Sequence, residues 1–174
     1  AQIRWQHDIN QRMQLILAVE EPKNDYTALD SAESVRAAIP EIVVKPVYKF
    51  ANGTWVSSLV YKPIIYTDKD YSFKKKLGSW GFSSSVTFRL AEKAMLNPFG
   101  LKKRTINVFG IIGEGTQGSV NDFGGLGYEA FPKDNTTLET MLYYGGYVSY
   151  SFVWKKRWST TSVASYLYQQ QPQG

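Results

Sequence analysis

The chain has 174 residues, a formal net charge of +5 and no cysteine, which excludes a disulfide framework and a thiolate metal site. No apolar run approaches the ~18 residues that a transmembrane helix needs. Aromatic residues make up 15% of the chain, and the mean hydropathy is −0.31. These values fit a soluble protein or a β-barrel, because barrel strands alternate polar and apolar residues.

The first part of the chain alternates between polar and apolar side chains, as half-buried strands do. Strands are predicted at about residues 1–8 and 11–21, joined by a tight polar turn. In the long connection that follows, Asp30 or Ser31 can cap a helix that Pro40 would stop. One helical turn is therefore predicted there.

The third and fourth strands are predicted at about residues 41–50 and 54–66. Asn52-Gly53 predicts a hairpin between them, because this pair readily takes positive φ. Pro63 fits poorly inside a central strand and predicts a strand end or a bulge. The charged stretch after it, residues 67–78, is predicted to be a loop.

The second half of the chain begins with the most regular alternation, in the fifth predicted strand at residues 79–90. A sixth strand follows at about residues 103–113. The glycine-rich residues 114–144 are interpreted as one long loop. The seventh and eighth strands, at about 145–154 and 158–169, flank a basic turn.

The connections between these strands alternate between short and long, as they do in an up-and-down antiparallel barrel with turns at one end and loops at the other. The sequence therefore predicts an all-β, up-and-down antiparallel barrel with about eight strands in this chain. The whole chain, residues 1–174, is expected to be a single domain.

The apolar faces of the predicted strands begin or end with aromatic residues, a pattern typical of the girdles of a membrane barrel. A soluble β-sandwich or barrel is the alternative for the alternation alone. The opposite faces hold serines and cations, which predicts a wet and cationic interior that favours anions. Alternatively, the cations pair with Glu20 or Glu41. The predicted girdle residues are Trp5, Trp55, Trp80, Trp154 and Trp158, and the predicted pore-lining residues are Arg4, Lys45, Lys49, Lys62 and Arg89.

Within residues 113–135, glycines would let the backbone fold into a lumen and narrow it. Asn121, Asp122 and Glu129 would then face a permeating solute. An outward surface loop is an equally good interpretation of this stretch.

Enzymatic chemistry is not expected from this sequence. His7 is the only histidine, and it shares a face with Ile3 and Trp5 rather than with a serine and an acid. The stretch Gly-Glu-Gly-Thr-Gln-Gly lacks the Gly-Lys-Ser/Thr of a phosphate-binding loop. Glu20 and Glu21 could bind a divalent cation, although a solvated rim is the default. No cofactor and no metal are expected.

Three segments resemble the central part of the DcaP-like outer-membrane porins of Gram-negative bacteria. They are QLILAVEEPKND (14–25), IPEIVVKPVYKFANGTWVSSLVYKPI (39–64) and YYGGYVSYSFVWKKRWST (143–160). The resemblance implies a homotrimer of sixteen-stranded barrels in the outer membrane, surrounded by lipid and lipopolysaccharide. It implies passive diffusion of small hydrophilic, often anionic, solutes, and no nucleic-acid partner.

Two features depart from that family. About half of the family's strands are readable here, and the last residues, YLYQQQPQG, lack a terminal aromatic strand. The chain is therefore expected to be a portion of a longer porin. Two alternatives remain open: a small closed eight-stranded outer-membrane barrel with a structural or adhesion role, and a soluble β-barrel that binds nucleic acid or glycan.

Overall fold

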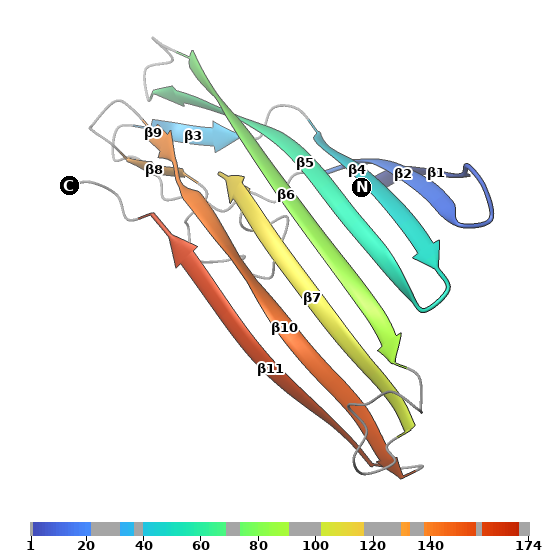
Figure 1. Cartoon of the computed structure of the whole chain (residues 1–174). Coiled ribbons are helices and arrows are strands. Elements are labelled where there is room, and N and C mark those ends of the chain that lie inside the picture. The colour runs from blue at the N-terminus through green and yellow to red at the C-terminus, as the bar shows by residue number, and fades with distance from the viewer. Residues whose placement is uncertain are drawn as a thin grey trace.

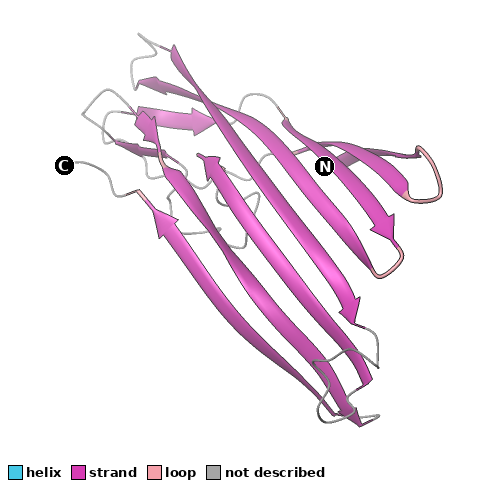
Figure 2. Ribbon diagram, in the orientation of Figure 1, coloured by secondary structure: helices cyan, strands magenta, loops and turns pink. Residues whose placement is uncertain are grey.

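The structure is a computed structural model that describes residues 2–21, 32–36, 40–68, 74–90, 102–116, 130–132, 138–155 and 158–170. Every regular element in these ranges is a strand (Figure 2). Within the same ranges, no helix has the length and apolar character needed to cross a membrane.

The strands form a nine-stranded sheet and a separate two-stranded sheet (Figure 1). The main sheet runs in the order β1-β2-β4-β5-β6-β7-β10-β11. β3 pairs with the last residues of β5, which extend beyond the start of β4. The strands are β1 (Gln2–Asp8), β2 (Met13–Glu20), β3 (Ala32–Arg36), β4 (Glu41–Phe50), β5 (Gly53–Asp68), β6 (Lys74–Leu90), β7 (Lys102–Glu114), β8 (Ala130–Pro132), β9 (Leu138–Thr140), β10 (Leu142–Lys155) and β11 (Trp158–Gln169).

Each strand of the main sheet is antiparallel to the next one along the path, so the chain forms a meander with two interruptions, β3 and the β8–β9 hairpin. This confirms the predicted all-β, up-and-down antiparallel architecture. The sheet is curved but not closed, since β1 and β11 lie at its two ends and do not pair with each other (Figure 1).

The central strands are unusually long. β5 has 16 residues, β6 has 17 and β10 has 14. Strands of globular proteins are most often ~5–6 residues long, whereas a tilted strand needs ~9–11 residues to cross a bilayer. The central strands are therefore long enough to cross a bilayer and to extend beyond it.

The predicted helical turn is wrong for residues 32–36, which form β3 instead. Arg36 pairs with Ile65, and Ile42 at the start of β4 pairs with Tyr61. Five residues separate Arg36 from Ile42, whereas three separate their partners, so β3 and β4 pair with successive parts of β5. The strand end or bulge predicted at Pro63 is wrong for β5, which continues through the proline in unbroken register with β6.

Two other predictions need correction, and a third is confirmed only in part. β6 begins at Lys74, so the predicted loop at residues 67–78 is partly strand. The predicted long loop at 114–144 contains β8, β9 and the start of β10. The Asn52-Gly53 hairpin is confirmed, because Phe50 pairs with Gly53. However, neither Asn52 nor Gly53 has positive φ, which among the described residues is confined to Lys103 and Gly115.

Candidate functional site

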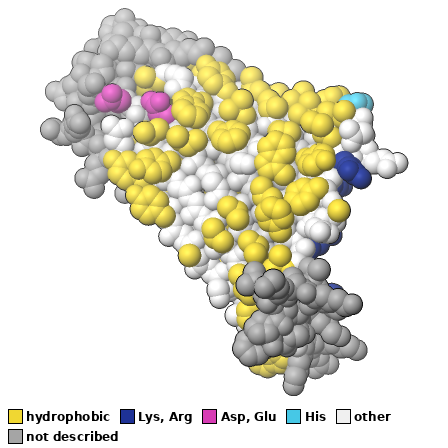
Figure 3. All heavy atoms as spheres, in the orientation of Figure 1, with side chains coloured by type: hydrophobic (Ala, Val, Ile, Leu, Met, Phe, Trp, Pro, Cys, Tyr) yellow, Lys and Arg dark blue, Asp and Glu magenta, His cyan; other side chains and the backbone are white. Residues whose placement is uncertain are grey.

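The two faces of the main sheet differ in chemistry, and the strand register identifies them. Trp55 pairs with Val86, which pairs with Val108, so these side chains share one face, called here the outer face. Figure 3 views this face, with hydrophobic side chains spread over it and the single histidine, His7, at its edge. The exposed large side chains of the chain lie mostly here, which is the reverse of an ordinary soluble core.

All five tryptophans lie on the outer face. Trp55, Trp154 and Trp158 lie at the ends of their strands nearest the short turns, and Trp80 lies toward the opposite end, where it pairs with Glu114. Trp5 lies in the middle of β1 and stacks on His7 with ring centroids 5.4 Å apart. Four of the five predicted girdle residues therefore lie toward one or other end of the strands, and Trp5 does not.

Two tryptophan side chains on the outer face have hydrogen-bond partners on the same face. Trp55 Nε1 donates to Ser84 Oγ at 2.9 Å, and Ser57 Oγ lies 3.0 Å from the same oxygen. Trp154 Nε1 donates to Thr160 Oγ1 at 2.8 Å. Hydrogen bonds of this kind are required where no water is available. The outer face is thus chemically suited to contact with hydrocarbon.

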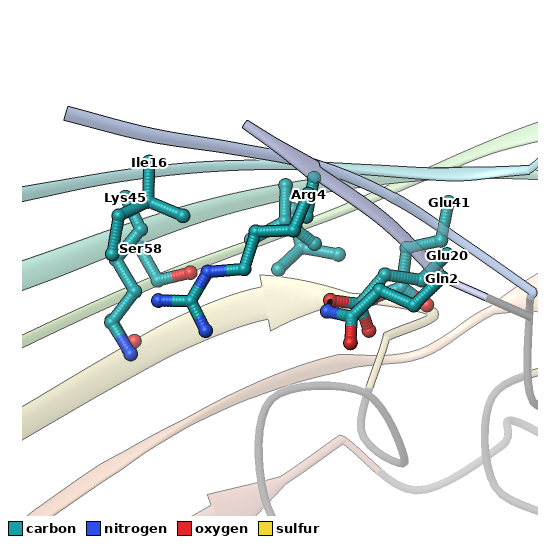
Figure 4. A pocket seen from close by; sticks show the side chains of 11 residues that line it. Gln2, Arg4, Ile16, Glu20, Glu41, Lys45 and Ser58 are labelled. Atoms are coloured by element: carbon teal, nitrogen blue, oxygen red, sulfur yellow. Dashed lines mark hydrogen bonds between the residues drawn. The ribbon is translucent and has the colours of Figure 1, made fainter. Parts of the chain in front are cut away.

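The opposite, inner face contains a hollow of about 360 Å³ on β1, β2, β4, β5 and β6. Of the predicted cations, Arg4 and Lys45 line it (Figure 4). Lys49 and Arg89 lie on the same face by alternation, nearer the short turns, and both are exposed. Lys62 also has inner-face register but is 0% exposed. The structure therefore brings together two of the five predicted pore-lining residues.

Two carboxylates, Glu20 and Glu41, also line the hollow, and the sequence predicted them only as alternative partners of the cations. Glu20 of β2 pairs directly with Glu41 of β4, and Gln2 Nε2 donates to Glu20 Oε1 at 2.6 Å. Alternation along β2 and along β4 gives each carboxylate inner-face register. Their meeting across two strands depends on a register that no local pattern encodes.

The inner face of the remaining strands carries a polar network beside an aromatic pair. Thr87 Oγ1 donates to Asn107 Oδ1 at 3.3 Å, and Asn107 Nδ2 donates to Tyr147 Oη at 3.0 Å. Tyr147 stacks on Phe109 with ring centroids 5.1 Å apart. This wall offers hydroxyl and amide groups rather than a nucleophile paired with a base.

Other predicted site residues take no part in the hollow. Asn121, Asp122 and Glu129 lie outside the described residues. Among the residues that the structure describes, no group of three or more His, Cys, Asp or Glu side chains could hold a metal ion.

Comparison with known proteins identifies a fold but no family. No protein-family model matches the chain, and no curated protein matches its sequence. The crystal structure of the outer membrane channel DcaP of Acinetobacter baumannii is similar, with a TM-score of 0.73 at 12% sequence identity. The alignment covers 97% of this chain and 44% of that chain. The open sheet therefore has the fold of a portion of a larger porin-like barrel.

Proposed function

We propose that this chain forms part of the wall of an outer-membrane porin, a water-filled channel for passive diffusion of small hydrophilic solutes. The single observation that carries the proposal is the inverted polarity of the sheet. Exposed aromatic and aliphatic side chains cover the outer face, and the hollow lined by Arg4 and Lys45 lies on the inner face. Such polarity suits hydrocarbon outside and water inside.

Barrel closure in this proposal requires strands outside residues 1–174. The edges of β1 and β11 present unpaired backbone groups, and each group left unpaired in hydrocarbon costs several kcal/mol. The likeness to a channel chain of more than twice this length supports closure by further strands. Placement in the outer membrane of a Gram-negative bacterium and assembly as a homotrimer follow from the same proposal.

Anion preference is the proposed selectivity of this channel. Lys49 and Arg89 are exposed cations on the inner face, and a low-dielectric wall strengthens their field on permeating ions. Such a channel needs no catalytic group, so an enzymatic role is not proposed.

The test is conductance of the complete barrel in planar lipid bilayers. Stepwise current increases are expected, together with a reversal potential in a KCl gradient that indicates preference for chloride. The double variant Lys49→Gln with Arg89→Gln should move the reversal potential toward zero, while Arg12→Gln, at an exposed cation in the turn between β1 and β2, is the control. Absence of steps, or a protein that stays monodisperse without detergent, would contradict the proposal.

A further inference from the structure

The hollow on the inner face carries opposite charges at two ends. Its positive end is formed by Arg4 and Lys45, and its negative end by Glu20 and Glu41 (Figure 4). We propose that this hollow is a binding subsite for small zwitterionic solutes that carry a carboxylate at one end and an ammonium group at the other. The inference rests on the proposed channel function, because it assigns a solute class to the inner wall of that channel.

The positive end is suited to a carboxylate. In Figure 4 the side chain of Arg4 extends toward Lys45 and Ser58 and away from the glutamates. Arg4 Nη2 lies 3.5 Å from Gln6 Oε1, which is a neutral partner. The side chain of Lys45 makes no hydrogen bond or ion pair with the described residues. Two cations and a hydroxyl therefore converge without an acidic group of the sheet between them.

The negative end is suited to an ammonium group. Glu20 and Glu41 are directly opposite each other on neighbouring strands, an arrangement that destabilises a sheet when both are charged. Lys62 follows Tyr61, the partner of Ile42, so it has the register position beside Glu41. Glu20, on the side away from Lys62, has a neutral partner in Gln2. Glu20 is thus the carboxylate that a solute cation would neutralise.

The spacing of the two ends sets the size of the solute. Arg4 pairs with Ala18 and Lys45 with Ile16, two and four residues before Glu20 on β2, which places the positive end ~7–13 Å from Glu20 along the strand. A straight chain of four carbons with charged ends matches this spacing. The hollow of about 360 Å³ has room for such a molecule together with water.

A cationic wall alone would favour a dianion over a zwitterion. Glu20 reverses that order, because a second carboxylate of the solute would lie against a like charge. Among solutes of equal length, the subsite is therefore expected to bind a zwitterion most tightly, a dianion less tightly and a dication least tightly.

The test uses three four-carbon solutes, γ-aminobutyrate, succinate and 1,4-diaminobutane, with the complete protein in lipid nanodiscs. Saturation-transfer NMR measures binding without requiring conduction, and bilayer recordings of the same protein measure the channel. γ-Aminobutyrate should bind most tightly. Glu20→Gln should weaken its binding about tenfold and strengthen that of succinate, and Arg4→Gln should weaken both. Asp8→Asn is the matched control, since Asp8 has inner-face register outside the hollow.

The outcomes separate the subsite from the channel. Succinate binding as tightly as γ-aminobutyrate, or Glu20→Gln leaving γ-aminobutyrate binding unchanged, would overturn the subsite even if conductance is normal. Selective binding of γ-aminobutyrate that depends on Glu20, in a protein that conducts no current, would uphold the subsite and reject the channel.

Discussion

At the scale of single residues, Gly53 occupies a position where a side chain has no space. A Cβ built there would lie 2.1 Å from the carbonyl oxygen of Thr87 and 2.6 Å from ring atoms of Phe50. Glycine is required by this close approach of β6 and the Phe50 ring rather than by backbone conformation, since its φ is not positive. The β4–β5 hairpin depends on this close packing.

We therefore expect Gly53→Ala to lower the free energy of unfolding by at least ~2 kcal/mol, because backbone atoms of β6 would have to move. Gly78→Ala is the matched control, since a Cβ at Gly78 meets nothing within 4 Å. That change should leave stability within ~0.5 kcal/mol or raise it slightly. Urea titration in lipid vesicles, followed by tryptophan fluorescence, measures both. Equal effects of the two substitutions would disprove the steric explanation.

Residue-scale features were predictable from the sequence where they depend on alternation alone. Arg4 and Lys45 were placed on the wet face because each is separated by an even number of residues from other polar positions on its strand. Glu20 was assigned to a solvated rim because it lies at a strand end, and its pairing with Glu41 depends on a register between two strands. Gly53 was assigned a role in φ because the carbonyl of Thr87 that restricts it belongs to another strand.

At the scale of the element, β6 offers the cleanest comparison of the two faces. Val86 faces outward in register with Val108, whereas Ser85 faces inward in register with Phe109. The two residues are adjacent, so they share depth, strand and neighbours along the chain. Only the face differs between them.

Val86→Arg is expected to destabilise the folded barrel by ~2–4 kcal/mol, the usual effect of arginine on a lipid-facing position near the bilayer centre. Ser85→Arg should have a much smaller effect, because its guanidinium would reach water in the lumen. Unfolding free energies in vesicles of phosphatidylcholine measure the difference. Reversed or equal effects would show that the faces are assigned wrongly.

Element boundaries were predictable where alternation was strong and failed where pairing with a distant strand decided the structure. Residues 32–36 carry a helix-capping pattern, yet they extend the pairing of β5 beyond β4. Lys74 and its neighbours resemble a charged loop, although they pair with the end of β5. In both cases the free backbone edge of a long strand outweighs local propensity.

At the scale of the whole molecule, the main sheet has exposed apolar side chains on one face and a charged hollow on the other, with an unpaired strand at each end. A soluble protein with this surface would expose an apolar area far larger than monomers tolerate. The proposed porin wall accounts for all three features, because hydrocarbon would cover the outer face and further strands would complete the wall.

Orientation of the two faces is therefore the central claim, and the absence of native cysteine allows it to be tested directly. Single cysteines would be introduced on three strands at neighbouring positions of opposite face: Val44 and Lys45, Phe82 and Ser83, and Asn107 and Val108. The measurement is the rate of modification by a charged, membrane-impermeant thiol reagent in lipid vesicles, compared with the rate after unfolding in urea. Cysteines at Lys45, Ser83 and Asn107, none of which is buried, should react in the folded protein, and those at Val44, Phe82 and Val108 only after unfolding. Rapid modification of the second group in folded protein, with the first group protected, would contradict the account.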